Sequence, residues 1–492
     1  MVFSLCFKFK MTKLCRFVVL VLVCITQLRG ADSQSELCNN RCKCIDENSV
    51  TNVDCTNVFI TLPVLYDNRS WFNDENVPYN YDKVVFKSSK LEDLVHQLPS
   101  SNLTYLDLTG NFIRKITDSC FAELQNMHTL ILSDNELEIL SPHVFKGVVT
   151  DGINYPLKSL KTLKLDNNRF HTLDDDIFEH LEQVLEVLDL SYNPFKVLDQ
   201  RTTIAISSII YLKELYLQYT DIKALPDNIL HTPKYLKVLD LTGNRFTSVP
   251  EGLTDAHVLE TLYLNTNPFV NITAENGFKN ISTLKTLHLC DMIELEYIGA
   301  RSLSALENLR ELHICNNMKL WHIDPAAFSR VEVESEIWAP IKKLYLQNNQ
   351  LSRIDFHLIL KWNELEELDL RYNPWSCECE NQWIADELMP IYIKLNETIA
   401  KDIVCRAPAA MDGVTFYKEH VDGKKMRCLD AYGNRPERDG TILIGVLIGL
   451  LIGIPLVLFI IFAYQRHWFG FCDNGPASFS RQFYKRTRSD EL

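Results

Sequence analysis

Side chains that could bind a ligand recur at one fixed position of a repeated motif. In the later copies this position holds phenol, imidazole and carboxylate groups, which bind partners through ring contacts and hydrogen bonds. Neighbouring copies would form a stripe, which is either a protein-binding surface or an ordinary amphipathic covering of a sheet. We predict that it is the ligand-binding site. Its members are Tyr216, Asp240, Tyr263, His288, His313 and Tyr345.

Further chemistry at this stripe is weakly indicated. His288 and His313 could sense pH or bind a metal, but two imidazoles without a suitably placed carboxylate are weak evidence. Asp174–Asp176 is acidic enough for calcium, yet it lies on a predicted convex turn and is typical of a solvated face. The chain has no G-x-S-x-G, no H-E-x-x-H and no phosphate-binding glycine loop. We predict no metal, no cofactor and no enzymatic activity.

The stripe follows from the repeat L-x-x-L-x-L-x-x-N-x-Φ-x-x-Φ, of which Leu236–Val249 is a complete copy. The x-L-x-L-x segment alternates with period two and predicts a short strand with one apolar face. One such strand cannot bury its leucines alone, so the copies must stack into a solenoid with a parallel sheet. The predicted inward positions recur every 22 to 33 residues. They are residues 84, 106, 130, 163, 188, 215, 239, 262, 287, 312, 344 and 368.

Two intervals carry insertions, Val148–Leu157 and Val331–Pro340. We interpret the first as a tolerated surface loop. For the second, which contains Trp338 on an acidic loop, a binding role and a plain loop stay equally open. Phenylalanines recur later in the repeats and are expected to fill the convex half of the core. They are Phe121, Phe145, Phe178, Phe278 and Phe328.

Both ends of the chain carry targeting signals. Basic residues and the apolar stretch 17–25 predict a secretory signal peptide over 1–33, cleaved near Gly30 or Ser33. Residues 441–463 are an uncharged run whose helix would measure about 34 Å, enough to cross a bilayer. Arginines follow it, so we predict a type I plasma-membrane protein with an extracellular N-terminus and a cytoplasmic tail over 464–492.

Cysteines are predicted to close the two open ends of the solenoid. Four precede the repeats and four follow them, a pattern that behind a signal peptide predicts disulfides rather than zinc sites. We therefore expect caps at 34–83 and 373–430, repeats at 84–372 (about twelve) and a linker at 431–440. The sequence allows three connectivities for each set of four. The sets are Cys38, Cys42, Cys44 and Cys55, and Cys377, Cys379, Cys405 and Cys428.

Charge and glycosylation signals agree with an extracellular surface. The formal net charge is −14, and the excess of acid lies between the predicted signal peptide and membrane helix, which argues against nucleic acid as a partner. Five N-x-S/T acceptors lie outside the predicted membrane segment and tail. They are Asn68, Asn102, Asn271, Asn280 and Asn396.

The repeats, caps and the motif Asn373-Pro374-Trp375-x-Cys377-x-Cys379 resemble extracellular leucine-rich-repeat proteins of the Slit, Nogo receptor and Toll-like receptor ectodomain type. The resemblance implies an α/β solenoid, a horseshoe with its parallel β-sheet on the concave face. It implies that the Asn of each repeat hydrogen-bonds the backbone of the turn, with looser geometry where Thr220 and Met292 replace it. It also implies first-to-third and second-to-fourth disulfides. These are Cys38–Cys44, Cys42–Cys55, Cys377–Cys405 and Cys379–Cys428.

Three cysteines are left over within the repeats. Cys290 and Cys315 share one frame position in adjacent copies, so they should lie side by side. The strand spacing suits their Cα atoms but leaves their Cβ atoms somewhat far apart, so a bond between them stays open. Cys120, next to Phe121, is expected to be a buried free thiol.

The membrane segment and tail offer two further contacts. Gly445, Gly449 and Gly453 fall at spacing four, which favours either a homodimer face or the usual glycine content of membrane helices. Asp490 and Leu492 at the C-terminus resemble a ligand for PDZ domains.

Two functional hypotheses follow. In the first, the protein binds an extracellular or cell-surface protein through the concave face, in adhesion or as a co-receptor. In the alternative, it is an auxiliary or decoy subunit that associates laterally with another receptor through the glycine face. The sequence does not name the partner.

Overall fold

The computed structural model describes most of the chain from the N-terminal cap to the end of the predicted membrane helix. The predicted signal peptide, Cys428, and Asp490 with Leu492 lie outside the described residues. The chain forms two compact units, Met1–Ser376 with Trp383–Asp422, and Cys377–Gln382 with Gly423–Leu492. The described residues are 35–39, 41–47, 49–147, 149–150, 153–154, 157–332, 335–426 and 436–466.

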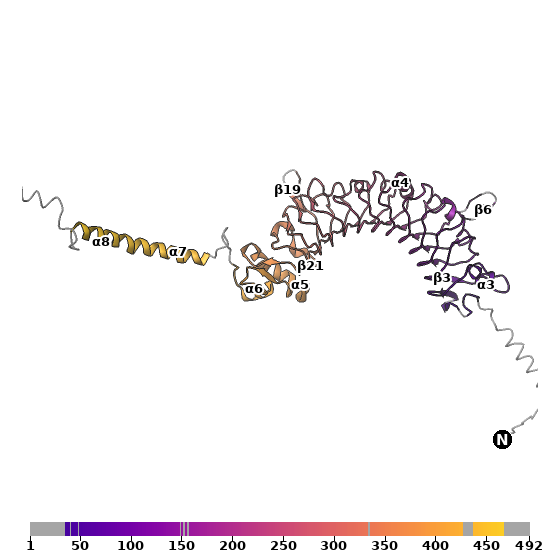
Figure 1. The fold of residues 1–492 in the computed structure, drawn as a ribbon, viewed down its shortest axis with the longest axis horizontal. Coiled ribbons are helices and arrows are strands. Elements are labelled where there is room, and N and C mark those ends of the chain that lie inside the picture. Colours follow the sequence, from indigo (N-terminus) through magenta and orange to yellow (C-terminus); the bar gives the residue numbers. More distant parts are fainter. Residues whose placement is uncertain are drawn as a thin grey trace, which may run out of the picture. The chain divides into compact units, whose positions relative to one another are not determined.

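A 14-stranded sheet runs through the first unit and lines the concave side of a curved solenoid (Figure 1). Val84 pairs with Leu106, and the parallel register continues from leucine to leucine as far as Leu368, so the predicted frame is confirmed. The repeat strands are β3 (Tyr81–Val85), β4 (Tyr105–Asp107), β5 (Thr129–Ile131), β8 (Thr162–Lys164), β9 (Val187–Asp189), β10 (Glu214–Tyr216), β11 (Val238–Asp240), β12 (Thr261–Tyr263), β14 (Thr286–His288), β16 (Glu311–His313), β20 (Lys343–Tyr345) and β21 (Glu367–Asp369).

The core of the solenoid has two parts. Leucines on the inner side of each strand are fully buried, for example Leu215 and Leu287 at 0% exposure. The five phenylalanines predicted for the convex half are also buried, none more than 5% exposed. Each repeat therefore contributes apolar area to one continuous core, which is what stabilises strands of only three residues.

Asparagines tie each repeat to the one before it. The amide oxygen of Asn244 accepts hydrogen bonds from the backbone N–H groups of Thr220 (3.1 Å) and Ile222 (3.2 Å). Its Nδ2 donates to the carbonyls of Leu217 (2.7 Å) and Leu241 (2.9 Å). Buried backbone groups that the turn would leave unpaired are satisfied in this way.

Both substitutes for this Asn are accommodated. The Thr220 hydroxyl donates to Leu217 O at 3.0 Å, which reproduces one bond of the missing amide. Met292 is 0% exposed, and its backbone N–H donates to Oδ1 of Asn317 from the next repeat at 2.8 Å. The turn at Met292 is thus held by its neighbour rather than by its own side chain.

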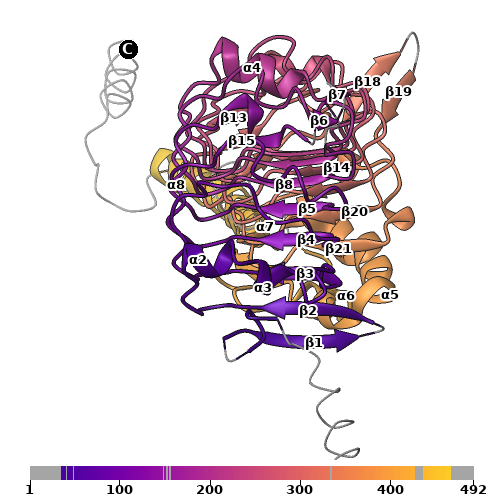
Figure 2. The ribbon, with the colours of Figure 1, turned by 90° about the vertical axis from the view of Figure 1, so that its right-hand side faces the viewer.

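The N-terminal end of the core is covered by a hairpin and two short helices (Figure 2). Strands β1 (Lys43–Glu47) and β2 (Val50–Asp54) are antiparallel, and β2 joins β3 in parallel. Helices α2 (Leu62–Leu65) and α3 (Asn68–Trp71) follow, and Trp71 packs edge-on against Tyr81 at 5.9 Å. Disulfides join Cys38 to Cys44 and Cys42 to Cys55, with Cα atoms 5.7 and 4.4 Å apart.

The C-terminal end is covered by helices α5 (Met389–Ala400) and α6 (Phe416–Asp422) and by the strand pair β22 (Trp375–Ser376) and β23 (Cys405–Ala407). The Tyr392 hydroxyl accepts a hydrogen bond from Leu370 N at 3.1 Å. Cys377, Cys379 and Cys405 are disulfide-bonded. Because Cys428 is outside the described residues, the predicted pairing of this cap stays a prediction.

Both insertions form antiparallel hairpins on the outer side of the arch (Figure 1). Trp338 in the second hairpin donates its indole N–H to His357 O at 3.1 Å. The remaining elements are short. They are β6 (Val149–Thr150), β7 (Ile153–Asn154), β13 (Asn271–Ile272), β15 (Tyr297–Ile298), β17 (His322–Ile323), β18 (Ser329–Glu332), β19 (Ser335–Trp338), α4 (Gln200–Ser207), the 3-10 turns η1 (Pro142–Phe145), η2 (Glu251–Asp255), η3 (Phe356–Leu358), η4 (Trp362–Glu364) and η5 (Cys379–Asn381), and the π-turn η6 (Ile384–Leu388).

Among the described residues of the second unit, one helix, Gly440–Gln465, is long and apolar enough to cross a membrane. It includes all but the first turn of α7 (Pro436–Ile448), the π-turn η7 (Gly449–Gly453) and α8 (Ile454–Gln465). The π-turn ends two residues before Pro455, whose ring has no N–H to donate and would clash with the preceding turn of a regular α-helix. The wider turn removes that conflict.

Candidate ligand-binding face

Four residues of the predicted stripe form one stacked column of rings, here called the aromatic column. Tyr263 and His288 have ring centroids 4.3 Å apart, and His288 and His313 are 4.1 Å apart. Tyr345 completes the column 4.2 Å from His313, and all three ring pairs are inclined by 16° or less. These rings project from β12, β14, β16 and β20, which are adjacent in the sheet.

The other two members of the stripe continue along the same row but do not stack. Tyr216 and Asp240 are in register with Tyr263 on β10 and β11. The Tyr216 hydroxyl donates to Glu214 at 2.8 Å. Asp240 is 7% exposed, and its carboxylate accepts from Thr242 N (2.9 Å) and from Gln218 (2.6 Å). Asp240 therefore supports its own strand more than it faces solvent.

Charged side chains beside the column were missed at the sequence level. Nε2 of His313 is 2.9 Å from Glu311, and the Tyr345 hydroxyl donates to Glu367. Lys343 forms a 2.9 Å ion pair with the same Glu367. The alternation of side chains along a strand could have found them, because each shares a face of the sheet with a column residue. Each lies either two residues before that residue on the same strand or on the neighbouring strand.

The column has an unusual electrostatic environment. Burial, followed by the nearby His313, lowers the pKa of His288 from 6.5 to about 4, although Glu311 acts in the opposite direction. Burial raises the pKa of Tyr345, and the Glu367 carboxylate raises it further. Burial likewise raises the pKa of Asp240. At neutral pH the His288 imidazole is therefore uncharged and presents a flat, weakly polar surface.

A disulfide fixes the strands that carry the two histidines. The structure joins Cys290 to Cys315, two residues after His288 and His313, with Cα atoms 4.5 Å apart. Cys120, by contrast, is free and buried. Two residues after Tyr345, Gln347 has a buried Oε1 with no hydrogen-bond partner among the described residues.

A second pair of exposed rings lies at the edge of the sheet. Tyr192 and Tyr219 stack 4.9 Å apart and are 50% and 43% exposed. Both have positive φ, Tyr192 directly before the repeat Asn193 and Tyr219 directly before its substitute Thr220, and the next repeat has Gly243 at this position. A Cβ at Gly243 would lie 2.3 Å from the Tyr219 ring, so this glycine makes room for it. No expectation drawn from the repeat pattern included this pair.

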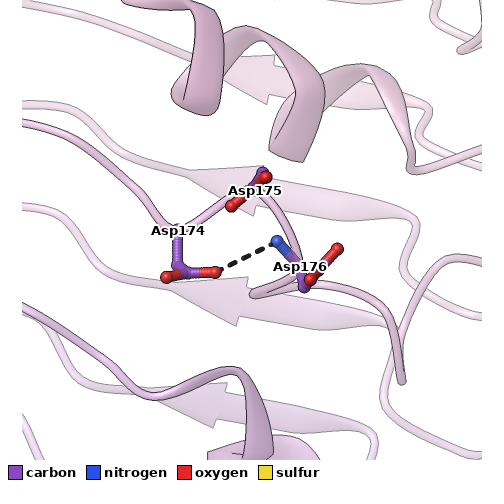
Figure 3. Close-up of side chains that lie close together, drawn as sticks. All are labelled: Asp174, Asp175 and Asp176. Atoms are coloured by element: carbon purple, nitrogen blue, oxygen red, sulfur yellow. Dashed lines mark hydrogen bonds between the residues drawn. The ribbon is translucent and has the colours of Figure 1, made fainter.

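The acidic triplet 174–176 is shown in Figure 3. Its carboxylates have oxygens within 4.8 Å of one another, and Asp174 accepts a hydrogen bond from Asp176 N at 3.3 Å. Arg201 forms ion pairs with Asp174 (2.5 Å) and Asp175 (3.4 Å). This guanidinium offsets one of the three carboxylate charges and occupies oxygens of Asp174 and Asp175.

The predicted glycosylation sites all have accessible asparagines. Asn68, Asn102, Asn280 and Asn396 are exposed, and Asn271 is half-buried on β13. In the second unit, a Cβ added to Gly445, Gly449 or Gly453 would meet nothing within 4 Å. The glycine face is thus open within the described chain.

A family model described as "Leucine-rich repeat region" matches residues 156–403, and a second, "Leucine rich repeat", matches 101–149. Together with the stacked strands and the asparagine bonds, this decides the family. The chain belongs to the leucine-rich-repeat family.

Several leucine-rich-repeat proteins are similar in sequence. The CD180 antigen of Mus musculus is 25% identical over 344 residues, which cover 68% of this chain and 44% of that protein. Toll-like receptor 8 of Homo sapiens is 28% identical, covering 42% of this chain and 20% of the receptor. Lumican of Bos taurus is 30% identical, covering 44% and 57%. The chain therefore spans less than half of the first two relatives.

Among solved structures, the glycosylated Toll–Spatzle complex of Drosophila aligns with 72% of this chain and 56% of that chain, at 19% identity and a TM-score of 0.44. The leucine-rich-repeat protein LIC12759 of Leptospira interrogans aligns at 21% identity with a TM-score of 0.39, covering 68% and 86%.

Proposed function

We propose that this protein is a type I cell-surface recognition protein that binds an extracellular protein through its concave face, in adhesion or as a co-receptor. The observation that carries the proposal is the aromatic column. Stacked rings that are half-buried in a rigid sheet supply contact area with little loss of side-chain entropy on binding. Binding hot spots are typically built from such residues.

The surroundings of the column suggest the chemistry of the partner. Glu311 and Glu367 place carboxylates beside the column, and the chain has a net charge of −14. A partner segment with donor groups and a basic surface would complement them. The disulfide Cys290–Cys315 holds the strands under the column, so binding requires little reorganisation.

The anchor supports a role at a membrane. The helix Gly440–Gln465 follows the repeats, and one relative carries the name Toll-like receptor 8. The predicted signal peptide and basic tail favour an extracellular solenoid. A binding role needs no catalytic group, in agreement with the missing catalytic motifs.

Cells that display the full chain can test this proposal. A panel of tagged extracellular proteins, including the soluble repeats themselves, is applied to cells with the wild-type chain or with the pair Tyr263→Ala and His313→Ala. A matched control removes another stacked pair, Tyr211 and Tyr235, whose rings are 5.3 Å apart. We expect a partner that binds wild type and control but not the column variant. A partner retained by the column variant at equal surface amount contradicts the concave assignment.

A second candidate function rests on the open glycine face. Gly445, Gly449 and Gly453 have no neighbour where a side chain would be added, so another helix could approach closely there. In this alternative the protein is an auxiliary or decoy subunit of another receptor. Replacing residues 441–463 with an unrelated membrane helix abolishes function in the alternative and leaves partner binding intact in the first proposal.

A further inference from the structure

A second small sheet places one glycosylation acceptor beside exposed rings. Strands β13, β15 and β17 are parallel, and their registers align Asn271 with Tyr297 and Tyr297 with His322. The alternate residues Ile272, Ile298 and Ile323 are buried, at 0, 0 and 8% exposure. Asn271, Tyr297 and His322 therefore form a row on the outward face, here called the outward row.

Tyr297 and His322 of the outward row line a groove of about 640 Å³, and Thr273, two residues after Asn271, lines it as well. Its walls include Thr273, Tyr297, Trp321 and the carboxylates of Glu275 and Asp324. Gly299 leaves the floor of the groove without a side chain. A Cβ at this position would lie 3.2 Å from the Tyr297 ring. Aromatic walls with a few hydrogen-bonding groups are the usual composition of a small-ligand site.

Trp321 is the most exposed ring of the groove. Its side chain is 59% exposed and stacks beside His322 with centroids 5.2 Å apart. Large aromatic side chains gain most of their stabilisation from burial. An indole held in place at the edge of a groove, with most of its surface open, is suited to cover another flat group.

The acceptor Asn271 has the geometry to place such a group. Its Oδ1 accepts from Nδ2 of Asn276 at 3.2 Å, and its own Nδ2 donates no hydrogen bond to any described residue. Adjacent strands are about 4.8 Å apart, so Tyr297 is one spacing away and His322 about 10 Å away. The first two sugars of an N-linked glycan would extend over this distance.

We propose that Asn271 is glycosylated and that the core of its glycan packs into the groove against Tyr297 and Trp321. The sugar arrives from a diphosphate-lipid oligosaccharide donor. A bond forms between Nδ2 and the sugar C1, the C1–O bond to the diphosphate breaks, and the amide proton leaves with the lipid diphosphate, without any change of oxidation state. The C–H face of each pyranose then covers a ring, and Glu275 accepts from sugar hydroxyl or amide groups.

The test uses the full chain expressed in animal cells and extracted in detergent. An endoglycosidase that cuts between the two core N-acetylglucosamines is applied to the native protein, and trimming at each site is followed by mass spectrometry of glycopeptides. Asn280 is the internal control, because it is an exposed acceptor nine residues along the chain. We expect a glycan on Asn271 that is trimmed more slowly than the one on Asn280.

Substitution of Trp321 distinguishes a glycan that packs against the indole from one that is only attached to Asn271. Trp321→Ser should speed trimming at Asn271 by roughly three- to tenfold and leave Asn280 unchanged, whereas Trp321→Phe should keep most of the protection. An unmodified Asn271 in the detergent-extracted protein overturns the proposal. Equal trimming rates in wild type and Trp321→Ser also overturn it.

A reciprocal measurement leaves the groove untouched. Asn271→Gln removes the acceptor while keeping an amide, and hydroxyl-radical labelling then reports the exposure of Trp321. We expect labelling of Trp321 to rise by roughly three- to tenfold while that of Tyr372, which is 70% exposed, stays constant. Unchanged labelling of Trp321 contradicts the proposed packing.

Discussion

The imidazole rings of His288 and His313 lie face to face, with centroids 4.1 Å apart and planes inclined by 16°. Two residues further along the same strands, Cys290 and Cys315 are covalently joined. The rings and the disulfide thus connect β14 and β16 on one face of the sheet. The centre of the proposed ligand face is consequently formed before any partner binds.

The stacked histidine should make stability depend on pH. The pKa of His288 is about 4 in the folded chain against 6.5 for an ordinary imidazole, so the unfolded chain binds more protons between these values. The contribution is fully present above pH 6.5 and is lost as the pH falls toward 4. Tyr263, His313 and Glu311 face the same ring.

The measurement is the melting temperature as a function of pH for wild type and His288→Phe, which keeps a ring but cannot titrate. We expect the melting temperature of His288→Phe to rise relative to that of wild type as the pH drops from 6.5 to 4. His171→Phe, at an exposed histidine, should show no such gain. Parallel curves for wild type and His288→Phe would refute the assignment.

Loss of the disulfide between repeats should destabilise the solenoid. Cys290 and Cys315 close a loop with a sequence separation of 25, so replacing both with Ser should lower the free energy of unfolding by about 3 kcal/mol. Thermal unfolding under non-reducing conditions measures this. The pair Thr129→Ser and Thr162→Ser, at neighbouring positions of β5 and β8, is the control and should have little effect. Similar melting of both double variants would count against a structural role for the bond.

Substitution of the repeat asparagine Asn244 should destabilise the solenoid more than substitution of Thr220, which replaces this asparagine in the previous repeat. Asn244→Ala leaves two N–H groups and two carbonyls without side-chain partners, at a cost of roughly 3–5 kcal/mol. Thr220→Val removes only a hydroxyl and should cost about 1–2 kcal/mol. Denaturant unfolding of the two variants compares them. The explanation fails if Thr220→Val is the more destabilising.

Much of the solenoid could be predicted because one period governs it. Leucine spacing determined the register from Val84 to Leu368 in the sheet. The row that includes Tyr263 and His313 followed from strand alternation. These features depend only on local periodicity, which the sequence displays directly.

Other features depend on local three-dimensional geometry that the periodicity of the sequence does not encode. A bond between Cys290 and Cys315 requires the strands to bring Cβ atoms closer than their average spacing, which only the local twist decides. Strands β13, β15 and β17 have two residues each, too few for an alternation signal. The groove beside Trp321 was therefore invisible in the sequence, as was the orientation of Tyr219 over Gly243.

The most direct test of the central claim is the affinity of the partner found with displayed wild-type chains, measured again with Tyr263→Ala and His313→Ala. The two rings are members of one column of half-buried aromatic groups, so we predict that the dissociation constant rises at least about 30-fold. The control pair Tyr211→Ala and Tyr235→Ala should leave it unchanged. An unchanged dissociation constant for the column variant, with its disulfide and surface amount intact, would contradict binding through the concave face.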